Sequence, residues 1–322
     1  MKLDIVATLG PASEDKNIIK KIIDGVYALR LNGSHLNKKS LKEKLDKLEM
    51  IFKEIGKEIP VIVDLKGAKI RIGRYPKVKK LPNNVTIQLL KESKESAIIP
   101  LNSSSFFKNI KVGMKLFLND AKVILEVKNI ENNKIECNIL KNGSLSSNKG
   151  INIKNHPIPY NKITDFDRDL IEISNQYSFT YFAFSFVHTG DEADLLKKIT
   201  SKKIVAKVER GESLEFLDNI DKKFDGIWFC RGDLGAQIGI ENLGKAQYDF
   251  IKKIPLFKSD IYLAGEVLYH LTDNDTPTRT EITQLYMLEK KGFKGFVLSD
   301  ETAIGKDPVN VINFLKRLTK SE

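Results

Sequence analysis

Short apolar runs alternate with longer amphipathic segments along most of this 322-residue chain. The short runs predict buried strands, and apolar residues at helical spacing between them predict helices that cover a sheet. The predicted strands are 3–8, 26–31, 59–64, 179–184, 203–208, 224–229, 260–264 and 294–298. The predicted helices are 14–24, 38–56, 164–176, 190–199, 211–219, 242–253, 277–291 and 307–319, with N-terminal caps at Ser13, Thr164 and Asp307.

This alternation predicts an α/β fold, a (β/α)8 or TIM barrel, because each strand must return parallel to the last through a right-handed helical connection. One long interruption follows the third strand, where residues 69–157 read as hairpins separated by Asn, Gly and Ser. We therefore expect a catalytic barrel domain of residues 1–68 and 158–322, with a small β-rich domain of residues 69–157 inserted into it. An insertion here lies over the face where barrel active sites form, so we interpret it as a lid, with a passive decoration as the alternative.

The composition narrows the class of protein. The chain has 41% hydrophobic residues and a net charge of +11. Lysines in 38–58 alternate with glutamates at helical spacing, as on a solvated helix face, so we expect small anionic ligands and no nucleic acid partner. We also expect a cytoplasmic protein with no membrane partner, because no stretch has the pattern of a spanning helix or signal peptide. The two cysteines and four histidines show no zinc-ligand spacing.

Charged and polar residues gather at the predicted C-terminal ends of strands, which meet at one mouth in a barrel. They are Arg30, Asn32 and Ser34 at the second strand, Asp64 at the third, Lys207 and Glu209 at the fifth, and Arg231 and Asp233 at the sixth. Because side chains alternate along a strand, Lys207 and Glu209 lie on the same side and can face one ligand.

Two carboxylates from neighbouring strand ends suit a divalent cation. Glu209 and Asp233 offer the hard oxygen ligands that Mg²⁺ takes, and Arg30 offers a guanidinium for a phosphate or carboxylate. The alternative is an ordinary ion pair of Lys207 with Glu209 at the barrel rim.

A second set of oxygen atoms is suited to a monovalent cation. It comprises Asn32, Ser34 and Asp64, which lie at adjoining strand ends. Asn and Ser are also common turn residues, which is the alternative interpretation.

Eight ordered segments resemble the signature segments of the pyruvate kinase family. They are "ATLGPAS", "LRLNGSH", "VDLKGAKIRIG", "NKGINI", "AKVERGE", "CRGDLG", "DTPTRTE" and "LSDETAIG". The resemblance runs from residue 4 to about residue 315 and holds only in outline in the inserted domain. Several blocks in order are far more specific than any single one.

The resemblance implies a Mg²⁺-dependent, and by the same analogy K⁺-dependent, glycolytic kinase that binds phosphoenolpyruvate and ADP and forms pyruvate and ATP. It implies that Lys207 contacts the transferred phosphoryl group, that Arg30 stabilises it, and that Glu209 and Asp233 hold Mg²⁺. It places K⁺ on Asn32, Ser34, Asp64 and the Leu65 carbonyl, the substrate carboxylate at Arg231, Gly232 and Gly265, and the nucleotide phosphates at Arg71 and Lys149.

Four positions depart from the family pattern. Gly265 and Glu266 stand where threonine and glutamine are usual, Asp300 where glycine is usual, and Ile304 where a lysine lies near the nucleotide. Two alternatives therefore stay open: a divergent family enzyme acting on another 2-oxo acid or enol phosphate, and a non-catalytic ligand-binding paralogue. We expect threonine restored at position 265 to raise activity.

The family's additional C-terminal domain has no counterpart in these 322 residues. We therefore expect no sugar-phosphate regulation of this chain, and the sequence leaves a homo-oligomer open.

Overall fold

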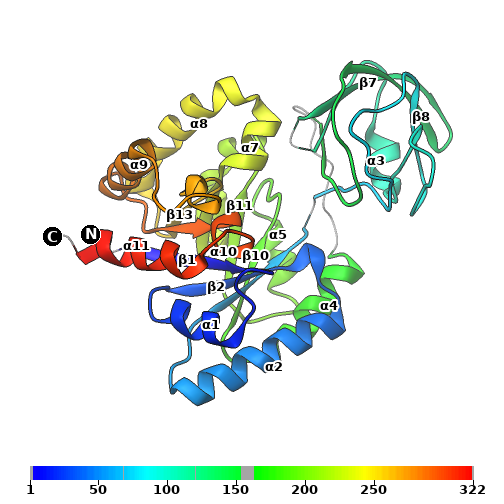
Figure 1. The fold of residues 1–322 in the computed structure, drawn as a ribbon. Coiled ribbons are helices and arrows are strands. Elements are labelled where there is room, and N and C mark those ends of the chain that lie inside the picture. The colour runs from blue at the N-terminus through cyan, green and yellow to red at the C-terminus, as the bar shows by residue number, and fades with distance from the viewer. Residues whose placement is uncertain (1–2, 68, 120, 154–162, 321–322) are drawn as a thin grey trace.

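The computed structural model of the chain describes residues 3–67, 69–119, 121–153 and 163–320, and its largest element is a closed, parallel barrel (Figure 1). The barrel strands are β1 (Asp4–Leu9), β2 (Ala28–Asn32), β3 (Val61–Leu65), β10 (Thr180–Phe184), β11 (Ile204–Val208), β12 (Gly226–Cys230), β13 (Asp260–Ala264) and β14 (Gly295–Leu298). They follow one another in chain order around the barrel, and β14 closes on β1. The predicted (β/α)8 fold is confirmed.

The strands are buried on both faces, which is why their sequences are nearly continuous apolar runs. In β12, for example, all five residues are buried. One set of alternating side chains fills the barrel, including Val6, Ala28, Ile62 and Trp228. The other set packs outward against the helices.

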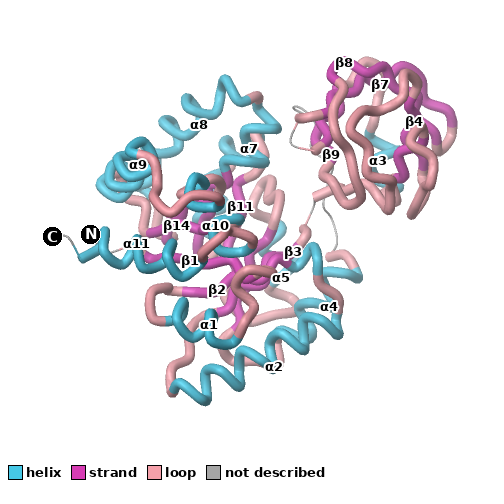
Figure 2. The backbone as a smooth tube through the Cα atoms, in the orientation of Figure 1, coloured by secondary structure: helices cyan, strands magenta, loops and turns pink. Residues whose placement is uncertain are grey.

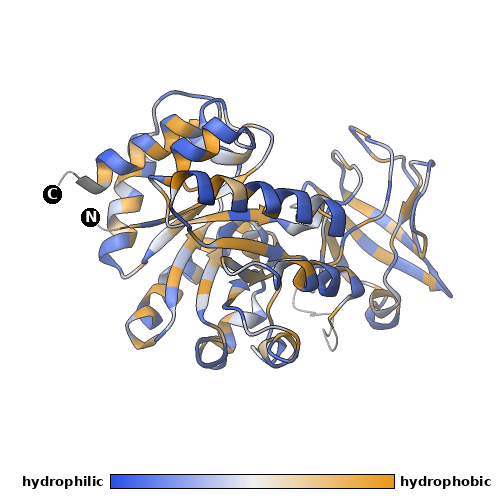
Figure 3. Ribbon diagram, turned by 90° about the horizontal axis from the view of Figure 1, so that it is seen from below, coloured by the Kyte–Doolittle hydropathy of each residue, from blue (hydrophilic) through white to orange (hydrophobic). Residues whose placement is uncertain are grey.

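The outer helices carry an apolar face toward the barrel and a polar face toward solvent, and Figure 3 shows this as alternating orange and blue along them. They are α1 (Lys16–Ile23), α2 (Lys38–Ile55), α4 (Asp165–Ser174), α5 (Glu192–Leu196), α6 (Leu217–Lys223), α7 (Arg231–Ile238), α8 (Ile240–Lys253), α9 (Arg279–Lys290), α10 (Asp300–Ala303) and α11 (Pro308–Lys320). In the described residues, no helix combines the length and the apolar character that crossing a bilayer requires.

The helix caps differ from expectation at one place. Thr164 caps α4, and the Asp307 carboxylate accepts the Asn310 N–H in the first turn of α11. The cap of α1 is Asp15, because the Ser13 hydroxyl instead accepts the Gly10 N–H. The Ser13 prediction is therefore wrong.

The sequence also failed to predict a helix at α7. The segment has two glycines and a weak apolar pattern, so it reads as a loop after β12. In the structure the helix begins at Arg231, directly where the strand ends. Its first backbone N–H groups therefore face the same end of the barrel as the strand termini.

The inserted residues form a separate sheet with its own core, which lies to one side of the barrel (Figures 1 and 2). Its strands run in the order β5 (Ile98–Pro100), β4 (Val85–Gln88), β8 (Lys134–Lys141), β7 (Val123–Glu131), β6 (Lys115–Leu118) and β9 (Ile151–Ile153), and α3 (Ser104–Asn109) packs on them. The expected boundaries after residues 68 and 157 fall outside the described residues.

Candidate active site

A cavity of about 800 Å³ opens at the C-terminal ends of the barrel strands. We call it the mouth. Eleven of the predicted site residues line it: Arg30, Asn32, Ser34, Asp64, Arg71, Lys149, Lys207, Glu209, Gly232, Asp233 and Gly265. Two of them, Arg71 and Lys149, come from the inserted sequence, so the mouth is built from both parts of the chain. Leu65 and the Arg231 side chain are not among its lining residues.

Lys207 lies at the centre of the mouth and is only 8% exposed. Its Nζ donates to Asp64 Oδ1 and Oδ2 at 3.1 and 3.0 Å and to Ser185 Oγ at 2.8 Å, and it lies 3.0 Å from Glu209 Oε1. Burial works to lower the pKa of Lys207, but the charges of Asp64 and Glu209 raise it above its ordinary value. The lysine is therefore a fixed positive charge in a poorly solvated place.

Arg30 approaches Asp64 from the neighbouring strand. Its Nε and Nη2 donate to Asp64 Oδ2 at 2.9 and 2.5 Å, and its Nη1 donates to Thr8 Oγ1 at 2.8 Å. Burial would raise the pKa of Asp64, but the Lys207 and Arg30 charges hold it below its ordinary value. Asp64 is thus an ionised anchor that orients two cations toward the mouth.

Glu209 and Asp233 form the carboxylate pair that the sequence predicted as a divalent site. Burial raises the pKa of Glu209, and the Asp233 charge adds to this, while Lys207 opposes it. Two buried carboxylates that disfavour each other's charge are stabilised by a cation between them. The pair fits Mg²⁺, because Mg²⁺ prefers oxygen ligands and often takes only one or two protein carboxylates.

The oxygen set predicted for K⁺ is only partly assembled at the mouth. Asn32 and Asp64 are register partners on adjoining strands. Asn32 Oδ1 accepts the Ser34 N–H at 3.2 Å, as in a turn. The Asp64 carboxylate is already occupied by Arg30 and Lys207, so a third cation has fewer free acceptor positions there.

The Arg231 side chain turns away from the mouth. Its guanidinium donates to the Gly265 carbonyl at 2.8 and 2.6 Å, to the Glu266 carbonyl at 2.7 Å and to Gln284 Oε1 at 2.9 Å. Arg231 therefore fixes the loop after β13, and only its main chain, at the start of α7, is placed to meet a ligand.

Gly265 has a backbone conformation that suits glycine. Its φ is +95°, and that of Glu266 is +52°. A Cβ at position 265 would lie 3.2 Å from the Gly232 nitrogen, so the loop packs closely on the N-terminus of α7. The side chain of Glu266 is not among the residues that line the mouth.

Arg71 places its guanidinium at the mouth from the inserted sequence. Its Nη1 donates to the Asn148 carbonyl at 2.9 Å, while its Nε is buried and has no hydrogen-bond partner in the described structure. Lys149 follows Asn148 and lines the same side. Together they form a cationic edge for an anionic ligand.

Sequence reasoning missed two contributors from the end of β10. The Ser185 hydroxyl accepts from Lys207 and donates to Asp64 Oδ1 at 3.2 Å. Phe186 has a left-handed backbone with φ +59°, and its N–H donates to Glu209 Oε2 at 2.9 Å. Ser185 could have been predicted from the sequence, because it continues the alternation by which Tyr181 and Ala183 face inward.

Two further missed residues are charged. Lys69 Nζ donates to both oxygens of Asp233 at 2.6 Å. Asp167, which is fully buried, accepts the N–H groups of Lys66 and Gly67 at 3.0 and 3.2 Å, and so fixes the backbone just beyond β3.

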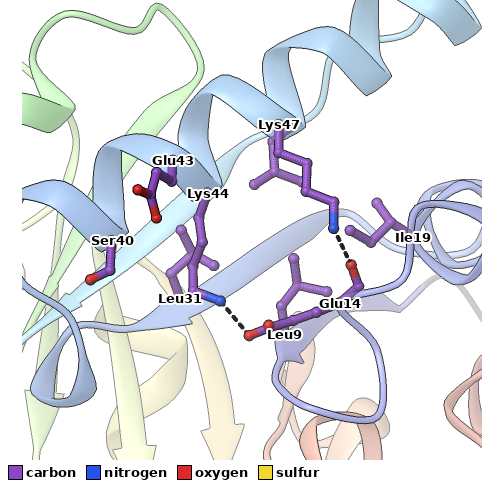
Figure 4. A pocket seen from close by; sticks show the side chains of 9 residues that line it. Leu9, Glu14, Ile19, Leu31, Ser40, Glu43, Lys44 and Lys47 are labelled. Atoms are coloured by element: carbon purple, nitrogen blue, oxygen red, sulfur yellow. Dashed lines mark hydrogen bonds and ion pairs between the residues drawn. The ribbon is translucent and has the colours of Figure 1, made fainter.

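A smaller cavity of about 200 Å³ lies beside the mouth, between α2 and the ends of β1 and β2 (Figure 4). Leu9, Leu31 and Leu48 are among its apolar lining residues. Glu14 pairs with Lys44 at its rim, and Lys47 Nζ donates to the Glu14 carbonyl at 2.6 Å. Leu9 and Leu31 line both cavities.

A parallel barrel with a buried lysine, an arginine and a carboxylate pair at its C-terminal mouth, and with a β domain inserted after β3, defines a class of TIM-barrel proteins with a charged cavity at the mouth. The family model for the barrel domain of pyruvate kinase matches residues 1–312. The chain belongs to the pyruvate kinase family.

Similar proteins agree with that assignment. The chain is 30% identical to the pyruvate kinase of Thermotoga maritima, with 98% of this chain and 70% of that protein covered. It is 30% identical to the pyruvate kinase of Thermococcus litoralis, with 99% and 69% covered. The crystal structure of a pyruvate kinase from Cryptosporidium parvum superimposes with a TM-score of 0.85 at 26% identity, covering 98% of this chain and 68% of that one.

Proposed function

We propose that this chain transfers the phosphoryl group of phosphoenolpyruvate to ADP, forming pyruvate and ATP, with Mg²⁺ and K⁺ as its cations. The observation that carries the proposal is the buried Lys207, held by Asp64 and Glu209 in a mouth that also presents Arg30. Phosphoryl transfer asks a protein for positioned positive charge and little covalent chemistry. Membership of the pyruvate kinase family supports the same reaction.

In this reaction Lys207 and Arg30 bind the transferring phosphoryl group, because their ammonium and guanidinium are fixed by Asp64 at the floor of the mouth. Arg71 and Lys149 bind the nucleotide phosphates from the inserted side. The first N–H groups of α7 bind the substrate carboxylate, as helix N-termini commonly do. Glu209 and Asp233 would hold Mg²⁺, which would neutralise charge on the phosphate oxygens.

K⁺ is the less strongly supported cation. Asn32, Ser34, Asp64 and the Leu65 carbonyl offer the all-oxygen chemistry that it prefers. However, Arg30 and Lys207 already neutralise Asp64, so we expect a modest dependence on K⁺.

The test is pyruvate formation from phosphoenolpyruvate and ADP, coupled to lactate dehydrogenase. The reaction is expected to require both substrates, to stop when EDTA removes Mg²⁺, and to slow when tetramethylammonium replaces K⁺. The kinase proposal would be overturned if pyruvate formed no faster than the background without protein, both with ADP and with other nucleoside diphosphates. An unchanged rate without K⁺ would remove K⁺ alone.

One observation favours a second candidate, a family enzyme that acts on another enol phosphate or 2-oxo acid. The loop at Gly265 lacks a hydroxyl and follows a left-handed path against α7, so the surroundings of the substrate differ from a site with threonine. Testing substituted enol phosphates in the same assay separates the two, since the second candidate requires a higher kcat/KM for one of them than for phosphoenolpyruvate.

A further inference from the structure

Lys69 reaches across the mouth to Asp233. Its Nζ donates to both carboxylate oxygens at 2.6 Å. β10 and β11 separate β3, which precedes Lys69, from β12, which leads into Asp233. The two side chains are 12% and 17% exposed, so solvent screens this ion pair far less than a surface pair.

The lysine stem is held on this path by its neighbours. A Cβ on Gly150 would lie 3.1 Å from Lys69 Cε, so the stem packs directly on the backbone of the inserted sequence. The Phe186 ring centroid lies 5.3 Å from Nζ, within the range of a cation–π contact. The position of the ammonium is therefore fixed by packing as well as by charge.

Lys69 supplies the positive charge that the carboxylate pair needs when no metal is bound. Its ammonium contacts both oxygens of Asp233 in a poorly solvated place, where an opposite charge at this distance stabilises the ionised carboxylate. Lys207 is the other cation at Glu209, but it is shared with Asp64. Because both Asp233 oxygens accept from Lys69, an ammonium and a divalent cation compete for the same acceptors and repel each other.

We infer that Lys69 is a tethered cation that fills the divalent-cation position of the mouth, and that a divalent cation binds there by displacing Lys69 from Asp233. The inference rests on the proposed function only in assigning the cation to Glu209 and Asp233. It follows that the site binds divalent cations more weakly than the carboxylate pair alone would, and that removing the Lys69 charge tightens binding.

The probe is Mn²⁺, titrated by calorimetry and by the electron paramagnetic resonance signal of the free ion, with no substrate present. Lys69→Met is expected to lower the Mn²⁺ dissociation constant about 10-fold or more, as expected when a displaced charge is removed from a poorly solvated site. Lys69→Gln provides a second, polar variant in case the methionine variant folds poorly. Lys69→Arg keeps the charge and is expected to stay near the wild-type constant.

Lys149→Met is the matched control, because it removes one positive charge from the same mouth. It is expected to change the Mn²⁺ constant by less than about 3-fold. Unchanged or weaker Mn²⁺ binding in both neutral Lys69 variants would overturn the inference. A Glu209→Gln, Asp233→Asn double variant that binds Mn²⁺ with the wild-type constant would also overturn the assignment of the cation to this pair. The double variant therefore distinguishes a wrong assignment of the cation from a wrong role for Lys69.

Discussion

The two sides of the mouth are held together by different means. On the side of β2, β3 and β11, charged side chains hold one another: Arg30 and Lys207 both bind Asp64, and Lys207 also pairs with Glu209. The identity of each side chain determines where its charge lies. This side can therefore be predicted from the sequence, since charged residues stand out at the ends of buried apolar strands.

The side of β12, β13 and β14 is held through the backbone. Arg231 binds the carbonyls of Gly265 and Glu266. The buried Glu301 carboxylate accepts the N–H groups of Val267 and Leu268 at 3.1 Å and of Ser299 at 2.7 Å. Here Arg231 and Glu301 shape loops instead of facing a ligand. A charged residue near a strand end is thus no proof of a ligand contact.

The comparison is tested most strongly at Lys207. Lys207→Met removes the shared partner of Asp64 and Glu209, so we expect kcat for the proposed reaction to fall about 10²- to 10³-fold, the usual cost of one fixed charge donor. Arg30 and Lys69 still neutralise the carboxylates, so the fold is expected to survive with a lower melting temperature. Steady-state kinetics with a thermal melt measures both.

Lys203→Met is the control for this variant, because Lys203 is an exposed lysine just before β11 at the opposite end of the barrel. It is expected to keep wild-type kcat. Equal kcat in Lys207→Met and wild type would reduce Lys207 to a structural ion-pair residue, and the difference between the two sides would then disappear.

The next largest effect is expected on the backbone-held side, at Gly265. The sequence suggested that Gly265→Thr would raise activity, but the structure argues the reverse. At φ +95° a threonine is strained, and its Cβ would crowd the Gly232 nitrogen. Left-handed backbone costs an L-residue roughly 1–2 kcal/mol, so we expect a lower melting temperature and a kcat/KM about 10-fold lower.

Gly56→Thr separates strain from crowding. Gly56 has φ +66° and ends α2, and a Cβ added there would have no atom within 4 Å. This variant is expected to melt at a lower temperature with kcat/KM unchanged. A gain in kcat/KM in Gly265→Thr would show that the loop re-forms around threonine and that its hydroxyl matters more than the glycine backbone.

The barrel and its charged side could be predicted because both follow from strand alternation. The period of two that fills the barrel with Ala28 and Ile62 also points Arg30 and Asp64 into it. α7 was missed because its glycines and weak apolar pattern hide a helix whose role is to present backbone N–H groups. The loop-shaping role of Glu301 could not be predicted, because the sequence does not reveal a hydrogen bond to the backbone of another loop.

Long-range side-chain contacts could not be predicted, for another reason. Lys69 meets Asp233 across a sequence separation of 164 residues, and Ser185 meets Asp64 across 121. Only the folding of the barrel brings these side chains together. A sequence pattern can tell that a residue faces the mouth, but not which partner lies opposite.

The smallest effect on catalysis is expected at Asp167, which braces the charged side from outside and whose titration acts on stability. Its carboxylate accepts from Lys66 N, Gly67 N and Thr164 Oγ1. Burial raises the pKa of Asp167 to about 6 from 3.8, although these hydrogen bonds oppose the shift. Between these two pH values the folded chain holds this proton more tightly than the unfolded chain does.

The sign of the pH effect follows from that difference. The contribution of Asp167 to the free energy of unfolding is greatest below pH 4 and is lost as the pH rises through about 6, by roughly 3 kcal/mol at most. The side chain of Asp167→Asn cannot ionise. We therefore expect the urea midpoint of this variant to rise relative to that of wild type when the pH is raised from 4.5 to 7. Asp169→Asn is the control and is expected to leave the pH slope as in wild type. It removes an exposed carboxylate from α4, the helix of Asp167, and this carboxylate pairs with Lys38 of α2. If stability changes with pH equally in Asp167→Asn and wild type, Asp167 stays ionised throughout this range, stabilised by the two backbone N–H groups beyond β3. The charged side of the mouth would then be braced by a permanent charge.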